Sequence, residues 1–261
     1  MPTLFVCHGG GPFPLQEPPV GGAALTEHLR AISTELPEKP KAILVISAHW
    51  EDGDKVAVTA SVQPPMLFDY YGFPPHTYEY QYNAPGDPAL ASRVCSLLTT
   101  SGHQCRLDET RGFDHGVFVP LMLAYPAADI PVVCVSLHRS LDAKLHLSMG
   151  RALRPLRDEG VLVIGSGMSF HNMRAFDGSG APAGARFDEA LVAAVTTGEH
   201  PARATSLAAW TSLPDARECH PREEHLLPLM VAAGAATDEE PATRTFGGIY
   251  MGVVLSSFRF G

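Results

Sequence analysis

Short apolar runs rich in β-branched residues alternate along this chain with stretches whose apolar residues recur every three or four positions. The runs are typical of buried strands and the stretches are typical of amphipathic helices. The predicted strands span residues 3–7, 41–47, 130–137, 160–166 and 247–258. The predicted helices span residues 24–36, 88–102, 141–156 and 185–198. This alternation predicts an α/β fold with a central, mostly parallel sheet that is flanked by helices.

The chain has 261 residues, which is compatible with one large domain or two small ones. No internal repeat divides it, so we expect a single domain over residues 1–261. The Gly-, Ala- and Pro-rich segment 176–185 is expected to be a surface loop. Segment 66–88 holds five of the seven tyrosines and four prolines. Such an irregular composition is expected of a lid over a cleft.

Charge and cysteine content exclude several classes of function. The formal net charge is −9 and Lys and Arg form no cluster, which argues against a nucleic-acid or anionic-membrane partner. No run approaches the roughly 18 apolar residues of a spanning helix, and no secretory leader is apparent. Five scattered cysteines without a C-x-x-C pair predict neither a disulfide framework nor a cysteine zinc site. We therefore expect a cytoplasmic protein that acts on a small molecule.

Histidines follow the predicted strands. His8, His49, His138 and His171 each come directly after, or close behind, one of the first four strands. Ligands of parallel α/β sheets bind outside the carboxyl ends of the strands, so these side chains are expected to meet in one crevice. His138 has an alternative role, because it could equally hydrogen-bond a neighbouring loop.

Two further histidines are expected where helices begin, on the same side of the sheet. His115 follows Asp114, a residue type favoured at the N-cap, and His225 follows Pro221, which suits a first helical position. Five other histidines need no ligand to explain them and are expected to be structural: His28, His76, His103, His146 and His200.

A cluster of imidazoles can both bind a divalent ion and transfer protons, because imidazole is a common metal ligand that titrates near neutral pH. Glycines accompany two of these histidines, at residues 9–11 and at Gly165 and Gly167. Because glycine has no Cβ, the backbone at these positions can pass close to an ion and its ligand.

Several motifs in collinear order carry a resemblance to a known family. They are "CHGGGP" (7–12), "ISAHW" (46–50), "FDYYGFPPHTYEYQYNAPGDP" (68–88), "GFDHGVFVPLMLAYP" (112–126), "GSGMSFHNMR" (165–174) and "HPREEHLLPLM" (220–230). From residue 5 to about residue 235 the chain resembles the DODA-type extradiol aromatic ring-opening dioxygenases of class III. The first motif departs from the usual "GHGSP" of that family and lacks its serine hydroxyl.

The resemblance implies a non-haem Fe(II) enzyme that opens a catechol such as DOPA beside its two hydroxyls, using O2. Zinc often occupies such sites on isolation. His8, His49 and His225 fall on the metal-ligand positions, and His115 and His171 fall on the acid/base positions. Glu224, immediately before His225, is an alternative third ligand, since more distant members supply a carboxylate there.

The expected mechanism follows from three protein ligands on one face of the ion. They leave three positions, enough for a bidentate catecholate and O2. His171 is the candidate base for a catechol hydroxyl and a later acid, and His115 is the candidate hydrogen-bond donor to the oxygen. Tyr70, Tyr71 and Tyr78 are candidates to cover the ring.

Three other interpretations remain open at this point. A zinc-dependent hydrolase could use the same histidines to activate water. A serine hydrolase would read "HGGG" as an oxyanion motif and Ser169 in "GMSFH" as the nucleophile, although the elbow lacks its last glycine. A homologue that has lost its metal could serve only to bind a ligand, although every expected histidine is retained.

Overall fold

A computed structural model describes residues 1–16, 22–197, 200–237 and 239–261. Within them the strands form one eight-stranded sheet of order β4-β3-β5-β2-β6-β1-β8-β7. The strands are β1 (Thr3–Cys7), β2 (Ala42–Asp52), β3 (Val56–Thr59), β4 (Cys105–Asp108), β5 (Val132–His138), β6 (Val161–Gly167), β7 (Ala242–Tyr250) and β8 (Val253–Phe260). The four central strands β5, β2, β6 and β1 pair in parallel, which confirms the predicted fold class.

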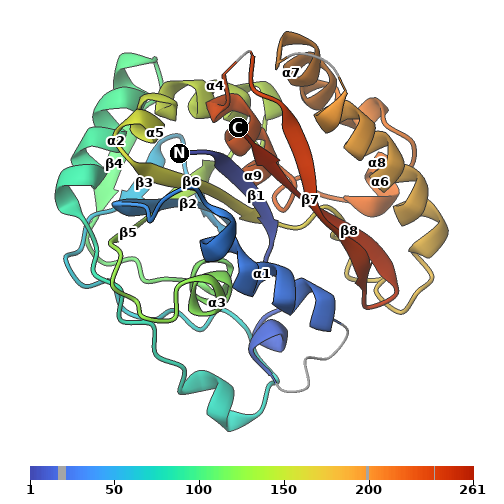
Figure 1. Ribbon diagram of the computed structural model, residues 1–261, viewed down its shortest axis with the longest axis horizontal. Helices are drawn as coiled ribbons and strands as arrows, with labels where there is room; N and C mark the ends of the chain where they lie inside the picture. The colour runs from blue at the N-terminus through green and yellow to red at the C-terminus, as the bar shows by residue number, and fades with distance from the viewer. Residues whose placement is uncertain (17–21, 198–199, 238) are drawn as a thin grey trace.

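Helices cover both faces of this sheet. Figure 1 shows α1 and α3 on one face and α2, α4, α5 and α9 on the opposite one, while α6 packs against β8. The helices are α1 (Ala23–Glu35), α2 (Pro88–Thr100), α3 (His115–Ala124), α4 (Ala143–Leu153), α5 (Pro155–Asp158), α6 (Ala181–Thr196), α7 (His200–Ala208), α8 (Ala216–Cys219) and α9 (Leu227–Ala235). None of the described helices is long and apolar enough to cross a membrane.

Burial explains why the central strands lack polar alternation. Residues 43–46 of β2 are at most 1% exposed, because β2 lies between β5 and β6 and helices cover both of its faces. Helix α9 is apolar on all sides and every one of its residues is buried, as expected for a helix enclosed by other elements. Its position behind β6 and β1 matters for the site, because the turn before it carries His225.

The segment predicted as one strand over residues 247–258 is instead a hairpin. Strands β7 and β8 are joined at Met251 and Gly252, both of which have positive φ. Positive φ at both central positions is the backbone that tight hairpins require, but methionine rarely adopts it. The apolar pattern therefore continues through the turn, and Met251 does not indicate a turn in the sequence.

Other boundaries also differ from the prediction. The expected loop 176–185 ends at Gly180, because α6 begins at Ala181 with a proline in its first turn. The predicted helix 141–156 is divided at Arg154, where Pro155 starts α5. Strands β3 and β4 were missed because each has only four residues. Residue 198 of the predicted helix 185–198 lies outside the described residues.

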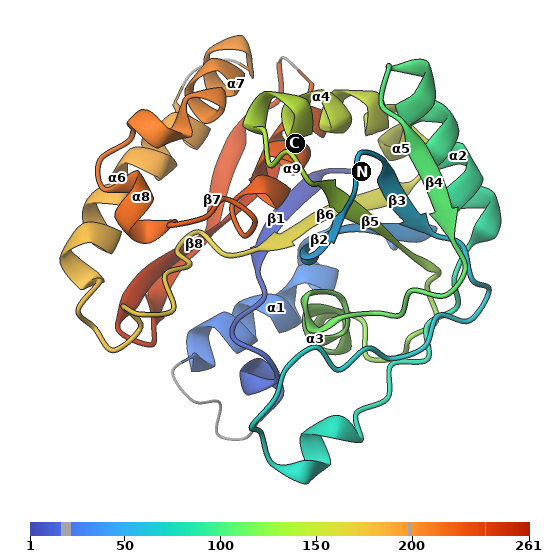
Figure 2. The same cartoon turned by 180° about the vertical axis from the view of Figure 1, so that it is seen from behind.

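Segment 66–88 is irregular, as expected. Before α2 begins at Pro88, it contains a short 3-10 helix, Pro75–Tyr78, and an isolated bridge from Met66 to Phe113. In both views this blue-green segment runs along the edge of the molecule next to α3 (Figures 1 and 2).

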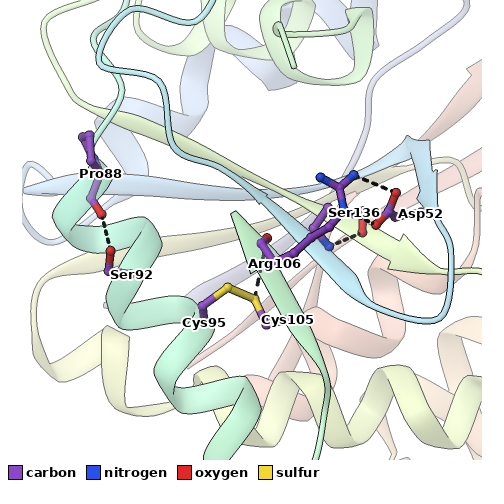
Figure 3. The surroundings of a disulfide bond; sticks show 8 residues. Asp52, Pro88, Ser92, Cys95, Cys105, Arg106 and Ser136 are labelled. Atoms are coloured by element: carbon purple, nitrogen blue, oxygen red, sulfur yellow. Dashed lines mark hydrogen bonds and ion pairs between the residues drawn. A yellow bond between two sulfur atoms is a disulfide. The ribbon is translucent and has the colours of Figure 1, made fainter. Parts of the chain in front are cut away.

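Cys95 and Cys105 form a disulfide, which we did not expect from their spacing. It joins α2 to the edge strand β4 (Figure 3). The adjacent Arg106 donates two hydrogen bonds to Asp52 at the end of β2, at 2.8 and 2.9 Å. The edge of the sheet is thereby tied both to a helix and to the strand that carries His49.

The buried His146 is a structural residue, as expected. In α4 its Nδ1 donates to the carbonyl of Asp142 at 2.7 Å, and its Nε2 accepts from the backbone N–H of His138 at 3.2 Å. Burial lowers the pKa of His146 to about 4. The folded protein thus holds this imidazole neutral over a pH range in which an unfolded chain would protonate it.

We predict that His146 contributes to acid destabilisation. Between pH 6.5 and about 4 the unfolded chain binds a proton that the folded chain does not, so the free energy of unfolding falls as the pH falls. The slope for one such group is about 1.4 kcal/mol per pH unit. Urea unfolding across this range is expected to show a shallower pH dependence for His146→Gln than for wild type. Parallel curves would contradict the assignment.

Candidate active site

The strand order brings His8 and His49 to one edge of the sheet. His8 directly follows β1. His49 lies near the end of β2, in the irregular stretch between Ile46 and Glu51 where the pairing with β5 shifts register. Both strands flank β6. The backbone N–H of His8 donates to the carbonyl of Gly167 at the end of β6, at 3.1 Å. The two histidines therefore lie on either side of the β6 terminus, as expected for carboxyl ends of parallel strands.

His225 reaches the same place because β6 ends in glycine. A Cβ on Gly167 would lie 2.1 Å from the carbonyl oxygen of His225, so a larger residue would displace the turn that carries His225. The backbone N–H of Met168 donates to that carbonyl at 2.9 Å and holds the turn in place. Helix α9 begins at Leu227, not at Pro221 as we predicted, and its first turn contains Pro228. His225 thus lies in the turn before the helix.

Three imidazoles meet at this point. One ligand nitrogen each from His8, His49 and His225 lies within 4.8 Å of the other two. The Nε2 atoms of His8 and His49 are 3.0 Å apart. Nitrogens this close can share one divalent ion, and imidazole suits iron and zinc alike. The described residues therefore fit the metal that we expected.

Each of the three rings also has a partner at its other nitrogen. Nδ1 of His8 lies 2.9 Å from Ser166 Oγ, and Nδ1 of His225 lies 3.1 Å from Glu224 Oε1. Nδ1 of His49 lies 3.6 Å from Asp69 Oδ2. Metal-binding histidines usually donate this second N–H to an oxygen, which fixes the tautomer and leaves Nε2 free for the ion.

The electrostatics keep these rings neutral. Burial, followed by the neighbouring imidazoles, holds the pKa values of His8 and His49 well below the ordinary value. Burial and His171 lower the pKa of His225 to about 3, against the opposing effect of Glu224. A neutral imidazole keeps the lone pair that a metal needs, so the site does not require a proton to leave before binding.

His115 and His171 lie on opposite sides of this trio. The ring centroid of His115, the first residue of α3, is 3.9 Å from that of His49. The ring of His171 stacks on that of His225 with centroids 3.3 Å apart. The structure thus gathers all five histidines proposed for metal binding and acid/base catalysis into one cluster.

Two carboxylates, Asp69 and Glu224, each contact two of these rings. Asp69 Oδ1 accepts hydrogen bonds from Nδ1 and from the backbone N–H of His115, at 2.8 and 2.9 Å, while its other oxygen faces His49. Glu224 Oε1 lies 3.1 Å from Nδ1 of His225 and 3.3 Å from Nδ1 of His171. Each carboxylate therefore contacts one ring of the trio and one of the two outer histidines.

Hydrogen bonds determine the charge of Glu224. Burial alone would raise its pKa, but hydrogen bonds to His171 and His225 outweigh this effect and hold the pKa well below its usual range. The carboxylate is ionised, and it uses one oxygen to orient two imidazoles. This arrangement favours His225 as the third ligand, with Glu224 as its hydrogen-bond partner.

Asp114 occupies the N-cap position of α3, but its side chain does not cap the helix. It is fully buried, accepts from Ser47 Oγ at 2.7 Å, and pairs with Arg111 at 2.9 Å. Arg111 also donates to the carbonyl of His49 at 3.1 Å. Asp114 therefore holds the end of β2, and the sequence pattern gave no sign of this role.

The other candidate residues lie elsewhere. Nδ1 of His138 lies 2.8 Å from Ser140 Oγ. Among the described residues, the groups that could bind a metal do not include His138. They also do not include His28, His76, His103 and His146. The side chain of His200 lies outside the described residues. Ser169 is 2% exposed, and its Oγ accepts from the backbone N–H of Ser256 at 2.8 Å. A hydroxyl buried and bonded in this way is not positioned to attack a substrate.

The three tyrosines differ in position. Tyr70 is buried, with its ring centroid 6.0 Å from that of His115 and its hydroxyl bonded to the carbonyl of Thr77. Tyr71 is 90% exposed. Tyr78 contacts the Tyr70 ring and accepts from the backbone N–H of Phe73. Of the three, Tyr70 is the one that approaches the histidine cluster.

A surface depression of about 460 Å³ opens beside His171. Its lining residues are His171, Asn172, Met173, Arg174, Pro221, Arg222 and Glu224. Because this opening reaches His171, one of the five clustered histidines, it offers a side from which a small molecule could approach the cluster.

Comparison with known proteins finds a family and several relatives that match most of the chain. The family described as "Catalytic LigB subunit of aromatic ring-opening dioxygenase" matches residues 11–259, a range that begins just after His8. The chain is 41% identical to the 4,5-DOPA dioxygenase extradiol of Beta vulgaris, covering 92% of this chain and 88% of that protein. It is 38% identical to the enzyme of the same name from Escherichia coli K12, with 97% and 91% covered.

Two further matches span the whole chain. The dioxygenase tasH of Hapsidospora irregularis is 38% identical over 100% of this chain and 85% of its own length. A crystal structure of an uncharacterized protein from Escherichia coli K12 superposes with a TM-score of 0.82 at 34% identity, with both chains covered completely.

Proposed function

Because the chain belongs to the LigB family of aromatic ring-opening dioxygenases, we propose that it is a non-haem Fe(II)-dependent extradiol dioxygenase whose single catalytic domain spans residues 1–261. Its substrate is a catechol, DOPA or a related compound. Both atoms of O2 enter the product, and the ring bond beside the diol is cleaved to give a semialdehyde. The observation that carries this proposal is the convergence of three imidazoles from distant parts of the chain.

His8, His49 and His225 would hold the metal. Bound Fe(II) would supply a common coordination point for catecholate and O2 and a path for electrons between them. Zinc fits the same nitrogens but has no redox chemistry, so a zinc-loaded protein would not perform this oxidation. Family membership favours the dioxygenase over the zinc-dependent hydrolase that the histidines alone left open.

His171 would move the proton of a catechol hydroxyl. It lies at the depression, where a substrate would enter, and its Nδ1 faces the ionised Glu224. With Nδ1 oriented in this way, Nε2 is the nitrogen that can accept a proton from the substrate and return it later. Glu224 would stabilise the imidazolium that forms in between.

His115 would serve on the other side of the cluster. Asp69 holds its Nδ1 and its backbone N–H, so the ring has one orientation. Donation from Nε2 toward oxygen would use the imidazolium form, because in the neutral ring the one proton is on Nδ1, and the Asp69 carboxylate would stabilise that cation. The buried Tyr70 ring lies beside it, with ring centroids 6.0 Å apart, and would limit the access of water on the side of segment 66–88.

The experiment that tests the function is anaerobic loading with Fe(II) followed by a panel of catechols in air. We expect O2 uptake together with a yellow ring-opened product, and no uptake by protein loaded with zinc. Iron-loaded protein that consumes no O2 with any catechol would refute the proposal, and ester hydrolysis by zinc-loaded protein would point to the hydrolase instead.

We predict that Glu224→Gln weakens metal binding by about 10- to 100-fold, the usual effect of losing an oxygen partner behind a ligand histidine. Calorimetric titration with Zn²⁺ measures it. Glu223→Gln is the control, since it makes the same change on the same loop at a carboxylate that pairs with Arg217.

The same titration separates the two candidates for the third ligand. If Glu224 and not His225 bound the ion, Glu224→Gln would lose metal as completely as removal of His49. His225→Gln would then have the smaller effect.

A further inference from the structure

Charged side chains line the depression beside His171. Two arginines, Arg174 and Arg222, line it together with one carboxylate, Glu224. Arg222 is already engaged, because its guanidinium pairs with both oxygens of Glu51 and lies 3.4 Å from Glu224. Arg174 is exposed, and no side-chain hydrogen bond or ion pair of it occurs within the described ranges. Arg174 is therefore the cation available to a ligand here.

The backbone holds Arg174 at a constant place relative to His171. The N–H of His171 donates to the carbonyl of Cys219 at 3.0 Å, and Asn172 Nδ2 donates to the carbonyl of Glu218 at 2.7 Å. The N–H of Arg174 in turn donates to Asn172 Oδ1 at 3.1 Å. These contacts attach residues 171–174 to α8. A substrate whose reacting end faces His171 therefore has Arg174 at its side.

An available guanidinium is informative in a chain with a net charge of −9. Such a protein repels anions in general, so binding an anionic substrate requires a local cation near the entrance. Guanidinium matches a carboxylate in charge and in geometry, because two parallel N–H groups can face two oxygens.

We propose that Arg174 binds a carboxylate on the side chain of the catechol and thereby selects anionic catechols over neutral ones. The inference rests on the proposed function, since it assumes that the diol lies beside His171. Arg174 is then a specificity-determining residue that contacts the substrate away from the bonds that change.

The test compares two catechols that differ in charge: 3-(3,4-dihydroxyphenyl)propionate and 4-ethylcatechol. For Arg174→Gln we expect KM for the propionate to rise about 10-fold, the size of one charge-assisted hydrogen bond at a partly solvated site. We expect kcat to stay nearly the same, and both constants for 4-ethylcatechol to stay unchanged. Arg174→Lys keeps the charge and is expected to recover part of the loss.

The matched control is Arg93→Gln. Arg93 is an exposed arginine paired with Glu159, which precedes β6 and so lies at the amino edge of the sheet, away from the site. Arg93→Gln changes the net charge by the same amount and is expected to leave KM unchanged for both catechols. A control with the same KM increase would show that overall charge, not Arg174, attracts the anion, and would overturn the proposal.

A charge reversal gives the sharper result. Arg174→Glu is expected to raise KM for the propionate further and to lower KM for dopamine, which carries an ammonium group. Equal effects on anionic, neutral and cationic catechols would overturn the proposal, because they would assign Arg174 a structural role.

Failure of the proposed function gives a different pattern. If no catechol is cleaved by the iron-loaded wild type, the dioxygenase assignment fails. Anaerobic calorimetry of the same two catechols still decides the subsite: tighter binding of the propionate to wild type than to Arg174→Gln supports it, and equal binding refutes it.

Discussion

Replacement of His49 by alanine is expected to abolish tight metal binding and to reduce ring cleavage by at least about 1000-fold. Structural zinc sites with four ligands are stabilised by roughly 10–16 kcal/mol, so each ligand supplies a few kcal/mol, which is on the order of 100- to 1000-fold in affinity. The two remaining imidazoles, His8 and His225, would hold the ion only weakly. Catalysis would then fall with occupancy and with the altered position of any ion that remains.

The measurement is metal content after dialysis, together with calorimetric titration of the metal-free protein. His76→Ala is the matched control, because it removes an exposed histidine of segment 66–88 that lies outside the cluster. The control should keep full occupancy and activity. Stoichiometric metal in dialysed His49→Ala would show that the ion is held elsewhere, and the proposed ligand set would be wrong.

Replacement of His171 by glutamine is expected to have the opposite signature, with metal retained and turnover reduced by about 100- to 10,000-fold. General acid/base groups contribute effects of this size. Glutamine keeps a polar side chain against the His225 ring, on which His171 stacks at 3.3 Å, so the third ligand keeps its surroundings. What disappears is the group that can accept and return the substrate proton.

Turnover per bound iron under saturating catechol and O2 is the quantity to measure. His138→Gln is the control, since His138 also follows a strand but bonds Ser140 and lies outside the cluster. It is expected to leave kcat unchanged. Loss of metal from His171→Gln with an unchanged rate per remaining iron would contradict the acid/base role.

Local pattern was sufficient for the fold and for most of the histidines. The strand-ending positions of His8, His49 and His171 can be predicted because the carboxyl ends of parallel strands always face one side of an α/β sheet. That rule also selected His138, which the structure places outside the cluster. Topology determines which edge of the sheet a residue occupies, but it does not determine the direction of its side chain.

The supporting residues could not be predicted in this way. Asp69 comes from the irregular segment 66–88, and it meets His115 and His49 through contacts that no periodicity describes. Ser166 and Asp114 appear in the sequence as an ordinary strand serine and an ordinary helix cap. Their contacts with Nδ1 of His8 and with Arg111 became visible only in three dimensions.

By itself, the sequence determined the alternation of strands and helices, the sheet edge at which imidazoles gather, and the residue types able to bind a metal there. These follow from interactions between near neighbours along the chain. Only the tertiary structure decided which nitrogen of each ring faces inward, that Glu224 lies behind His225, and that Arg174 is available to a ligand. Those properties depend on hydrogen bonds and packing between segments far apart in sequence, such as Gly167 against the carbonyl of His225.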